Sequence, residues 1–174
     1  WTQKGFVVPR LVFISPTYRC NLDCHGCYAA SPRPGDLPFN VLERVIGELQ
    51  ELGIFNAILL GGEPFVRKDL WLLFEKYPRT IFVVYTNGTF LGTEDIKRIG
   101  ELGNIRLMIS MEGFRENTDN RRGEGIYDTV VRCLDICQQA NIVYGVSVTV
   151  ARENFQEVTS GEFIEWLVER GAFH

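Results

Sequence analysis

The stretch Asn56-Ala57-Ile58-Leu59-Leu60-Gly61-Gly62-Glu63-Pro64 decides the fold class of this 174-residue chain. Its first part, Asn56–Leu60, is short and almost wholly apolar, which is typical of a strand in a parallel sheet. An amphipathic stretch of helical length, Pro38–Leu52, precedes it and ends at Gly53. Together they indicate one unit of a pattern in which strands and helices alternate.

The same alternation extends over the rest of the chain. The expected strands are Leu11–Thr17, Asn56–Leu60, Thr80–Tyr85, Ile105–Met111 and Val143–Val150. The expected helices are Pro38–Leu52, Asp69–Tyr77, Thr93–Leu102, Tyr127–Ala140 and Gly161–Arg170. Asp36, Thr93 and Ser160 are expected N-caps, because short polar side chains accept hydrogen bonds from the first helical amides. This α/β pattern predicts a parallel sheet with helical crossovers, either a barrel or an open doubly wound sheet.

Length and charge limit the classes of protein to consider. We expect one domain over residues 1–174, with five βα units and a sixth strand beyond His174. The net charge of −4 and the scattered Lys and Arg residues predict no nucleic-acid partner. No apolar run approaches the roughly 20 residues that span a bilayer, and Trp1–Arg10 lacks the pattern of a signal peptide. We therefore expect a cytoplasmic protein without a membrane span.

Three of the five cysteines, Cys20, Cys24 and Cys27, lie within eight positions directly after the first expected strand. Chemistry in α/β folds gathers at the carboxyl ends of strands. Thiolates at these spacings can surround a soft metal centre, and three of them leave one iron of a [4Fe–4S] cluster open to an exogenous ligand. An open iron indicates substrate chemistry rather than electron transfer alone.

Other readings of the cysteines are weaker. A structural zinc site would recruit His25, but His25 is adjacent to Cys24, and neighbouring residues rarely both reach one tetrahedral ion. Inert buried thiols explain the group less well still, because three cysteines in a glycine-containing loop pack poorly. Cys133 and Cys137 lie four residues apart on an expected helix, in line with apolar residues, and we interpret them as core.

With these motifs, the chain resembles the radical SAM superfamily. The superfamily's CxxxCxxC motif matches Cys20, Cys24 and Cys27, and its GGEP motif matches Gly61-Gly62-Glu63-Pro64 at the end of the second strand. Thr86-Asn87-Gly88 ends the third strand in the same way. The resemblance spans Leu11 to about Arg170 and favours the branch of peptide-modifying and sulfatase-maturating enzymes that carry a SPASM-type C-terminal extension.

This resemblance implies an enzyme with a partial (βα)6 TIM-like barrel that uses a [4Fe–4S] cluster and S-adenosylmethionine. The reduced cluster would break the sulfonium C–S bond, and a 5′-deoxyadenosyl radical would abstract hydrogen from an unidentified peptide or small molecule. A flavodoxin- or ferredoxin-type protein would supply the electron. The cofactors would carry the chemistry, while the protein orients them and excludes water.

The resemblance also implies roles for single residues. Gly61 and Gly62 would allow close backbone approach to the methionine moiety, and Glu63 would accept hydrogen bonds from its ammonium group. Arg122 would bind the methionine carboxylate, with Arg121 as the alternative one position away. The other expected cofactor contacts are Gly26 through its backbone, Tyr28 near the adenine, Thr86 and Asn87 after the third strand, Ser110 and Glu112 at the ribose, and Val146 at the adenine. The structural alternatives are a simple turn for Gly61-Gly62, a cross-strand hydrogen bond for Ser110 and Glu112, a solvated loop arginine for Arg122 or Arg121, and a core valine for Val146.

Two other functions stay open. A non-catalytic zinc or iron–sulfur scaffold module would need only the cysteine loop and would tolerate Glu63→Ala. A P-loop or dinucleotide-binding protein is disfavoured, because neither G-x-x-x-x-G-K-[ST] nor G-x-G-x-x-G follows a strand. The sequence names neither the substrate nor a general acid or base, since its only histidines are His25 and His174.

Overall fold

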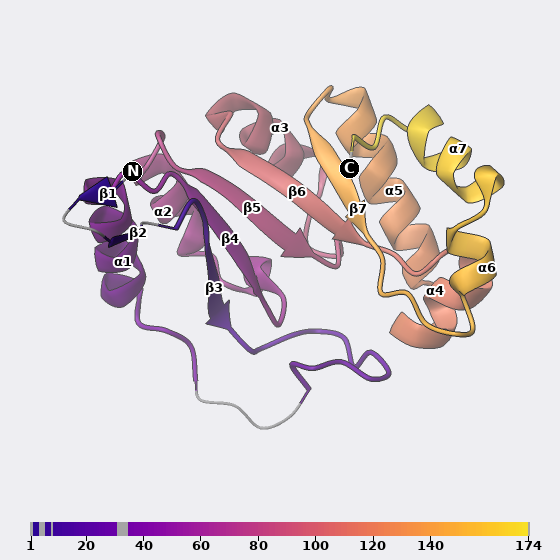
Figure 1. Cartoon of the computed structure of the whole chain (residues 1–174). Helices are drawn as coiled ribbons and strands as arrows, with labels where there is room; N and C mark the ends of the chain where they lie inside the picture. The colour runs from indigo at the N-terminus through magenta and orange to yellow at the C-terminus, as the bar shows by residue number, and fades with distance from the viewer. Residues whose placement is uncertain (1, 4–5, 8, 31–34, 174) are drawn as a thin grey trace.

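The computed structural model describes residues 2–3, 6–7, 9–30 and 35–173, and its main feature is one sheet of five parallel strands (Figure 1). The strands are β3 (Val12–Thr17), β4 (Asn56–Gly61), β5 (Ile81–Thr86), β6 (Ile105–Ser110) and β7 (Tyr144–Ser147). They lie side by side in chain order, with β3 and β7 at the two edges. The expected domain, 1–174, includes residues 1, 4–5, 8, 31–34 and 174, which lie outside the described residues. Of these, residues 1, 4–5 and 8 belong to the segment Trp1–Arg10.

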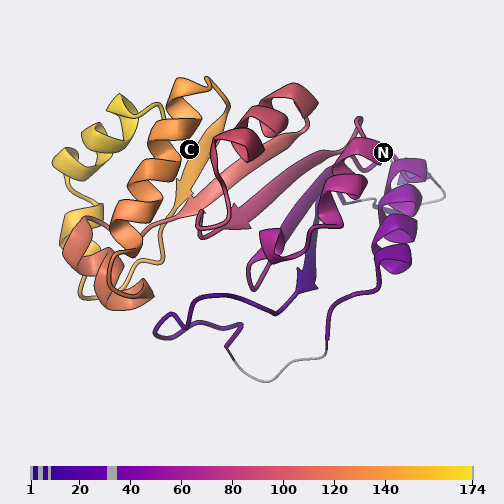
Figure 2. The ribbon, with the colours of Figure 1, turned by 180° about the vertical axis from the view of Figure 1, so that it is seen from behind.

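The helices decide between a barrel and a doubly wound sheet. The helices α1 (Phe39–Glu51), α2 (Leu70–Lys76), α3 (Thr93–Leu102) and α5 (Ile126–Gln139) all cover the same face of the sheet (Figure 2). A doubly wound sheet carries helices on both faces and reverses its strand order, whereas a barrel adds strands in one direction. The structure therefore confirms the prediction of a partial TIM-like barrel with five parallel strands.

The core lies between the sheet and this layer of helices. Along β5 and β6 every second side chain is fully buried, including Phe82, Val84 and Leu107. The ring of Phe82 packs 5.0 Å from that of Phe74 on α2. The side chains in between point to the uncovered face, so this alternation separates packing from the face that is free to form a site.

The expected strands and helices are all present, and their ends agree within one residue except at β7. The expected strand Val143–Val150 is shortened to Tyr144–Ser147. Ser147 pairs with Ser110, the last residue of β6, so the chain beyond it has no ladder partner on that side. Val150 is accordingly 57% exposed. The apolar pattern was thus longer than the backbone pairing that could support it.

Two of the expected N-caps are wrong. The α1 N-cap is Pro38 without a side-chain cap, and Asp36 instead accepts hydrogen bonds from Thr17 and Arg19, each at 2.6 Å. Thr93 is the first residue within α3, whose N-cap is Gly92. Ser160 is confirmed as a cap, because its hydroxyl accepts from the Phe163 amide at 3.2 Å.

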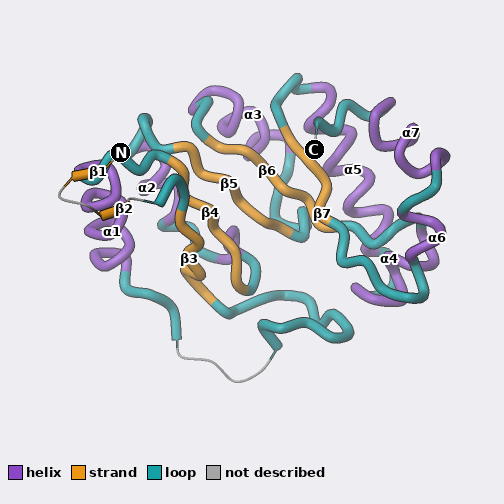
Figure 3. The backbone as a smooth tube through the Cα atoms, in the orientation of Figure 1, coloured by secondary structure: helices purple, strands orange, loops and turns teal. Residues whose placement is uncertain are grey.

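Several short elements were not predicted. They are the antiparallel pair β1 (Thr2–Gln3) and β2 (Phe6–Val7), the 3-10 turn η1 (Pro64–Val66), α4 (Arg115–Arg122) and α6 (Phe155–Val158). The helix α7 (Gly161–Glu169) was predicted and lies outside α5. Figure 3 shows that the loops leaving the carboxyl ends of the strands gather at one rim of the sheet. In the described parts of the chain, no helix has the length and apolar composition needed to cross a bilayer.

Candidate cofactor site

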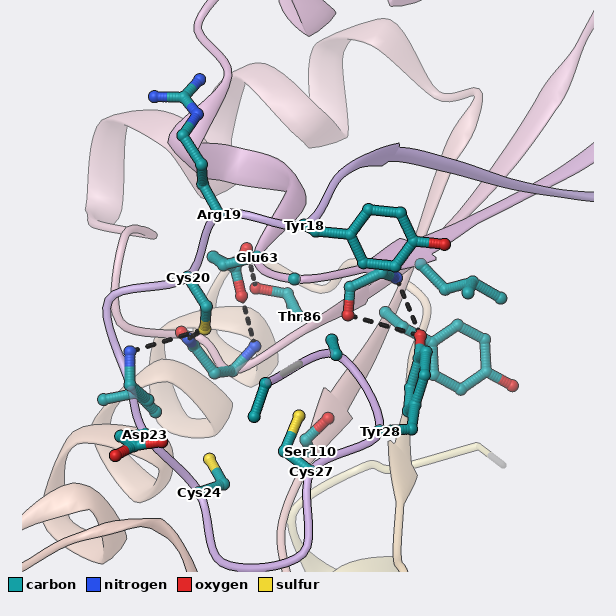
Figure 4. A pocket seen from close by; sticks show the side chains of 18 of the residues that line it. Tyr18, Arg19, Cys20, Asp23, Cys24, Cys27, Tyr28, Glu63, Thr86 and Ser110 are labelled. Atoms are coloured by element: carbon teal, nitrogen blue, oxygen red, sulfur yellow. Dashed lines mark hydrogen bonds between the residues drawn. The ribbon is translucent and has the colours of Figure 1, made fainter. Parts of the chain in front are cut away.

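A pocket of about 940 Å³ opens at the carboxyl ends of the strands (Figure 4). Its wall includes Leu60 of β4, Thr86 of β5 and Ser110 of β6, together with the cysteine loop, Cys20–Tyr28. The predicted site residues that line it are Cys20, Cys24, Gly26, Cys27, Tyr28, Gly61, Gly62, Glu63, Thr86, Asn87, Ser110 and Arg122. Glu112 and Val146 do not line it. Segments far apart in sequence therefore meet at one rim, as the parallel topology requires.

The glycine pair Gly61-Gly62 packs closely against the backbone segment that leads to Cys20. A Cβ on Gly61 would lie 2.4 Å from the Thr17 carbonyl oxygen, and one on Gly62 would lie 2.2 Å from that of Arg19. The amides of Gly62 and Glu63 donate to these same carbonyls at 2.9 and 2.8 Å. The glycines thus admit the backbone that delivers Cys20. Both also line the pocket, and their close approach to the methionine moiety stays a prediction.

The Glu63 carboxylate joins the ends of β4 and β5. It is 1% exposed and accepts hydrogen bonds from the Phe65 amide at 3.0 Å, the Thr86 hydroxyl at 2.9 Å and the Asn87 amide at 2.7 Å. Burial raises the pKa of Glu63, and these hydrogen bonds and the charge of Arg122 oppose that rise. A carboxylate offers about four lone-pair sites, so three protein donors leave capacity for a cationic ligand group.

The other end of the cysteine loop rests on α4. The His25 amide donates to the Arg121 carbonyl at 2.8 Å, and the Cys27 amide donates to the Cys24 carbonyl at 3.1 Å. Figure 4 shows the three cysteine sulfurs turned toward a common space beside Ser110. Burial raises the pKa of Cys20 and Cys24. Thiolate ligands at this place therefore call for the positive charge of a metal centre, which deprotonates the thiols it binds.

Two arginines line the pocket on the side of α4, and a buried glutamate lies behind them. Arg122 Nη2 lies 2.6 Å from Glu112 Oε1, while Arg121 Nε lies 3.3 Å from the same oxygen at an angle that makes no hydrogen bond. Both Nε groups are buried and have no hydrogen-bond partner in the described structure. Both side chains line the pocket. They can therefore donate to an anionic group held there, and a carboxylate suits a guanidinium best.

Glu112 and Val146 lie behind the wall of the pocket. Glu112 is 1% exposed, and its oxygens accept hydrogen bonds from Arg122 at 2.6 Å and from the Thr149 amide at 2.9 Å, so it holds Arg122, while its contact with the ribose stays a prediction. Val146 pairs with Ile109 on the helix-covered face and packs against the core, as the alternative of a core valine predicted. Ser110 does line the pocket.

Sequence reasoning missed several residues that line the pocket. Ser147, the last residue of β7 and in register with Ser110, does so, as does Thr149 two residues beyond it. The period of two along that strand could have identified them. Arg121 was only the alternative to Arg122, yet both line the pocket. Tyr18 and Tyr85 also contribute aromatic rings, and no motif marked them.

The residues of the pocket fit the [4Fe–4S] cluster and the S-adenosylmethionine that the resemblance implied. Three thiols face one space, and the side chains of Arg121 and Arg122 line the same pocket. Among the described residues, no three His, Cys, Asp or Glu side chains are arranged to hold a single metal ion. A cluster of several irons bridges thiols that stand further apart, and S-adenosylmethionine carries the carboxylate that Arg121 and Arg122 would bind.

A partial parallel barrel with a three-cysteine loop at its carboxyl rim defines the class, and the chain belongs to the radical SAM superfamily, whose family profile matches residues 14–164. Members of this superfamily are enzymes that use a [4Fe–4S] cluster and S-adenosylmethionine. The resemblance found in the motifs is thereby confirmed.

Individual proteins of known name are similar to this chain over part of their own length. The chain is 34% identical over 150 residues to Fe-coproporphyrin III synthase of Methanosarcina barkeri, covering 82% of this chain and 37% of that protein. It is 31% identical over 163 residues to mycofactocin maturase MftC of Mycobacterium tuberculosis, covering 90% and 41%. The fold matches Streptococcus suis SuiB bound to S-adenosylmethionine, with a TM-score of 0.81 at 16% identity over 94% of this chain and 39% of SuiB. The chain thus spans less than half the length of these proteins.

Proposed function

We propose that the protein catalyses the reductive cleavage of S-adenosylmethionine and uses the resulting 5′-deoxyadenosyl radical to abstract a hydrogen atom from a substrate. The observation that carries this proposal is that the three cysteines and the side chains of two arginines, Arg121 and Arg122, line one pocket. The other two cysteines, Cys133 and Cys137, are buried on α5. Among the described residues, the cysteine loop therefore has no fourth thiol beside it, and one iron stays open for S-adenosylmethionine.

When bound, a reduced cluster would supply the electron that cleaves the sulfonium C–S bond of S-adenosylmethionine into methionine and the 5′-deoxyadenosyl radical. The chain's own residues hold and orient the reactants. Cys20, Cys24 and Cys27 ligate the irons, and Arg121 and Arg122 bind the carboxylate of the methionine moiety. Glu63 accepts hydrogen bonds from the ammonium group while it fixes the loop after β5.

The substrate reaches the pocket from the face of the sheet that the helices leave uncovered. Phe13, Tyr18 and Tyr85 line the pocket there, so flat or apolar groups can pack beside the reacting carbon. A peptide and a small molecule both suit this wall. The names of the relatives support both classes, since one is a coproporphyrin synthase and another a maturase, and SuiB is known bound to the precursor peptide SuiA.

The electron comes from a reduced flavodoxin- or ferredoxin-type protein, and the reaction takes place in the cytoplasm. All five cysteines are free thiols, which fits a reducing compartment better than an oxidising one. A one-electron donor of low potential fits the chemistry, because the sulfonium bond accepts a single electron.

The test is anaerobic reconstitution of the protein with iron and sulfide, followed by reduction with dithionite in the presence of S-adenosylmethionine. We expect about four irons per chain and release of 5′-deoxyadenosine. Cys24→Ala should lose both. A chain that binds iron but releases no nucleoside would refute the enzyme and favour a scaffold module.

A matched control uses the same substitution outside the site. Cys133→Ala changes a cysteine that is 2% exposed in the core of α5. It should keep the iron content and the nucleoside product of the unchanged protein. Equal loss of iron in Cys133→Ala and Cys24→Ala would show that the cysteine loop is not the ligand set.

A further inference from the structure

Asn87, in the loop after β5, contacts the first cysteine of the loop. Its Nδ2 donates to Cys20 Sγ at 3.7 Å, within the range of a hydrogen bond to sulfur, and to Asn21 Oδ1 at 2.9 Å. The side chain is buried, since Asn87 is 6% exposed. Its backbone is fixed as well, because the Asn87 amide donates to Glu63 Oε2 at 2.7 Å. The donor is therefore held in place from two sides.

The orientation of the Asn87 amide follows from its other partner. The Thr89 backbone amide, which can only donate, lies 2.9 Å from Asn87 Oδ1. The oxygen must therefore face Thr89, and the NH2 group must face Cys20. A flipped amide would leave two donors opposed and the cysteine sulfur without this contact.

A ring of side-chain hydrogen bonds stabilises this orientation further. The Thr89 hydroxyl donates to Asn87 Oδ1 at 2.7 Å, and Asn21 Nδ2 donates to the Thr89 hydroxyl at 2.9 Å. Asn87 closes the ring by donating to Asn21 Oδ1. Each member of the ring satisfies another, so rotating one side chain costs more than one hydrogen bond.

We infer that Asn87 is a positioning residue that sets the reduction potential of the cluster through its hydrogen bond to the Cys20 sulfur. This inference rests on the proposed function, since it requires the cluster to be bound at Cys20. A donor aimed at a ligand sulfur stabilises the reduced cluster more than the oxidised one, because the reduced cluster carries one more negative charge. The midpoint potential is thereby raised, and reduction by the electron donor becomes easier.

The experiment is a potentiometric titration of the reconstituted protein, followed by electron paramagnetic resonance in the absence of S-adenosylmethionine. Asn87→Asp keeps the acceptor for Thr89 and replaces the NH2 donor with an acceptor oxygen. We expect a ratio of reduced to oxidised cluster about tenfold lower at a given potential, which corresponds to a midpoint about 59 mV more negative. Omitting S-adenosylmethionine separates this effect from any contact of Asn87 with that cofactor.

The matched control is Asn56→Asp, which makes the same change of charge at an exposed residue at the start of β4, the opposite end of the strands. It should leave the midpoint unchanged. An Asn87→Asp protein with full iron content and the midpoint of the unchanged protein would overturn the inference. An equal shift in Asn56→Asp would overturn it as well, because charge at any distance would then explain the result.

If Asn87→Asp fails to assemble the cluster, Thr89→Val serves in its place. It removes the hydroxyl that holds Asn87 Oδ1 but leaves the backbone amide of Thr89 and all three cysteines. We expect a smaller shift of the midpoint in the same direction, and no shift would refute the inference. Absence of a cluster in the unchanged protein would instead refute the proposed function itself, so the two failures are distinguishable.

Discussion

Substituting Gly62 by alanine tests whether the glycine pair serves the cysteine loop. The added Cβ would lie 2.2 Å from the Arg19 oxygen and 2.7 Å from the carbonyl carbons of Arg19 and Tyr18. Real Cβ contacts stay beyond 3.0 Å, and the obstacle is backbone rather than a flexible side chain. The segment that leads to Cys20 must therefore move away from β4.

The displacement breaks the two backbone hydrogen bonds that dock this segment. They are Gly62 N–H to the Thr17 carbonyl at 2.9 Å and Glu63 N–H to the Arg19 carbonyl at 2.8 Å. At about 1 kcal/mol each, their loss costs about 2 kcal/mol, which lowers the ratio of docked to undocked loops about thirtyfold. The core under the helices is not touched, so the cost falls on the loop.

The assay is the loss of iron from the reconstituted protein to a chelator. Gly62→Ala should lose iron far faster than the unchanged protein. Gly47→Ala is the control, because Gly47 lies within α1 and its Cβ would meet the Tyr77 hydroxyl at an ordinary 3.5 Å. Alanine should stabilise that helix by about 0.5–1 kcal/mol. A Gly62→Ala protein that keeps its iron as well as Gly47→Ala does would refute this account of the glycine pair.

Three further changes address the arginines, the core and an alkaline transition. Arg122→Lys keeps the charge but removes the guanidinium and its buried Nε, so S-adenosylmethionine should bind about tenfold more weakly at unchanged iron content, as equilibrium binding would measure; equal affinity would contradict the role of Arg122. Phe82→Ala empties a fully buried site against Phe74 and should cost about 3–5 kcal/mol in denaturant unfolding; a loss below 1 kcal/mol would contradict the packing. Burial raises the pKa of Tyr144 from 10.0 to about 12, so the stability that its protonated hydroxyl contributes is complete below pH 10 and is lost as the pH rises toward 12. Tyr144→Phe should flatten the curve of melting temperature against pH over this range, and an unchanged slope would assign the pH dependence to other groups.

Apolar periodicity identified the parts of the fold that bury apolar surface. The strands β4, β5 and β6 and the helices α1, α3 and α5 each have a face that must leave water, and the expected ranges matched them closely. The helix α4 was not predicted from the sequence, because its residues, Arg-Glu-Asn-Thr-Asp-Asn-Arg-Arg, bury only Thr118 and show no apolar face. A charge pattern could have found it, since Glu116 lies in its first turn and Arg121 and Arg122 in its last, which suits the helix dipole.

The candidate site was predictable where a motif and a strand end coincided. Cys20, Cys24 and Cys27, Glu63 and Asn87 all line one pocket for that reason. Contacts between motifs were not predictable, because they depend on the third dimension. Glu112 holds Arg122 from behind the wall, and Gly62 makes room for the Arg19 backbone.

The cysteine loop and the residues before it are attached to the rest of the fold at two separate places. The chain leaves β3 at one edge of the sheet, where Thr17 and Arg19 accept hydrogen bonds from Gly62 and Glu63, and then runs through the cysteine loop to Arg121 on α4, which follows β6 (Figure 1). This segment thus links the end of β4 to α4. A metal centre bound by the three cysteines should keep both attachments closed. The amides of Glu63 and His25, 38 positions apart in the sequence, should therefore become protected from hydrogen exchange together.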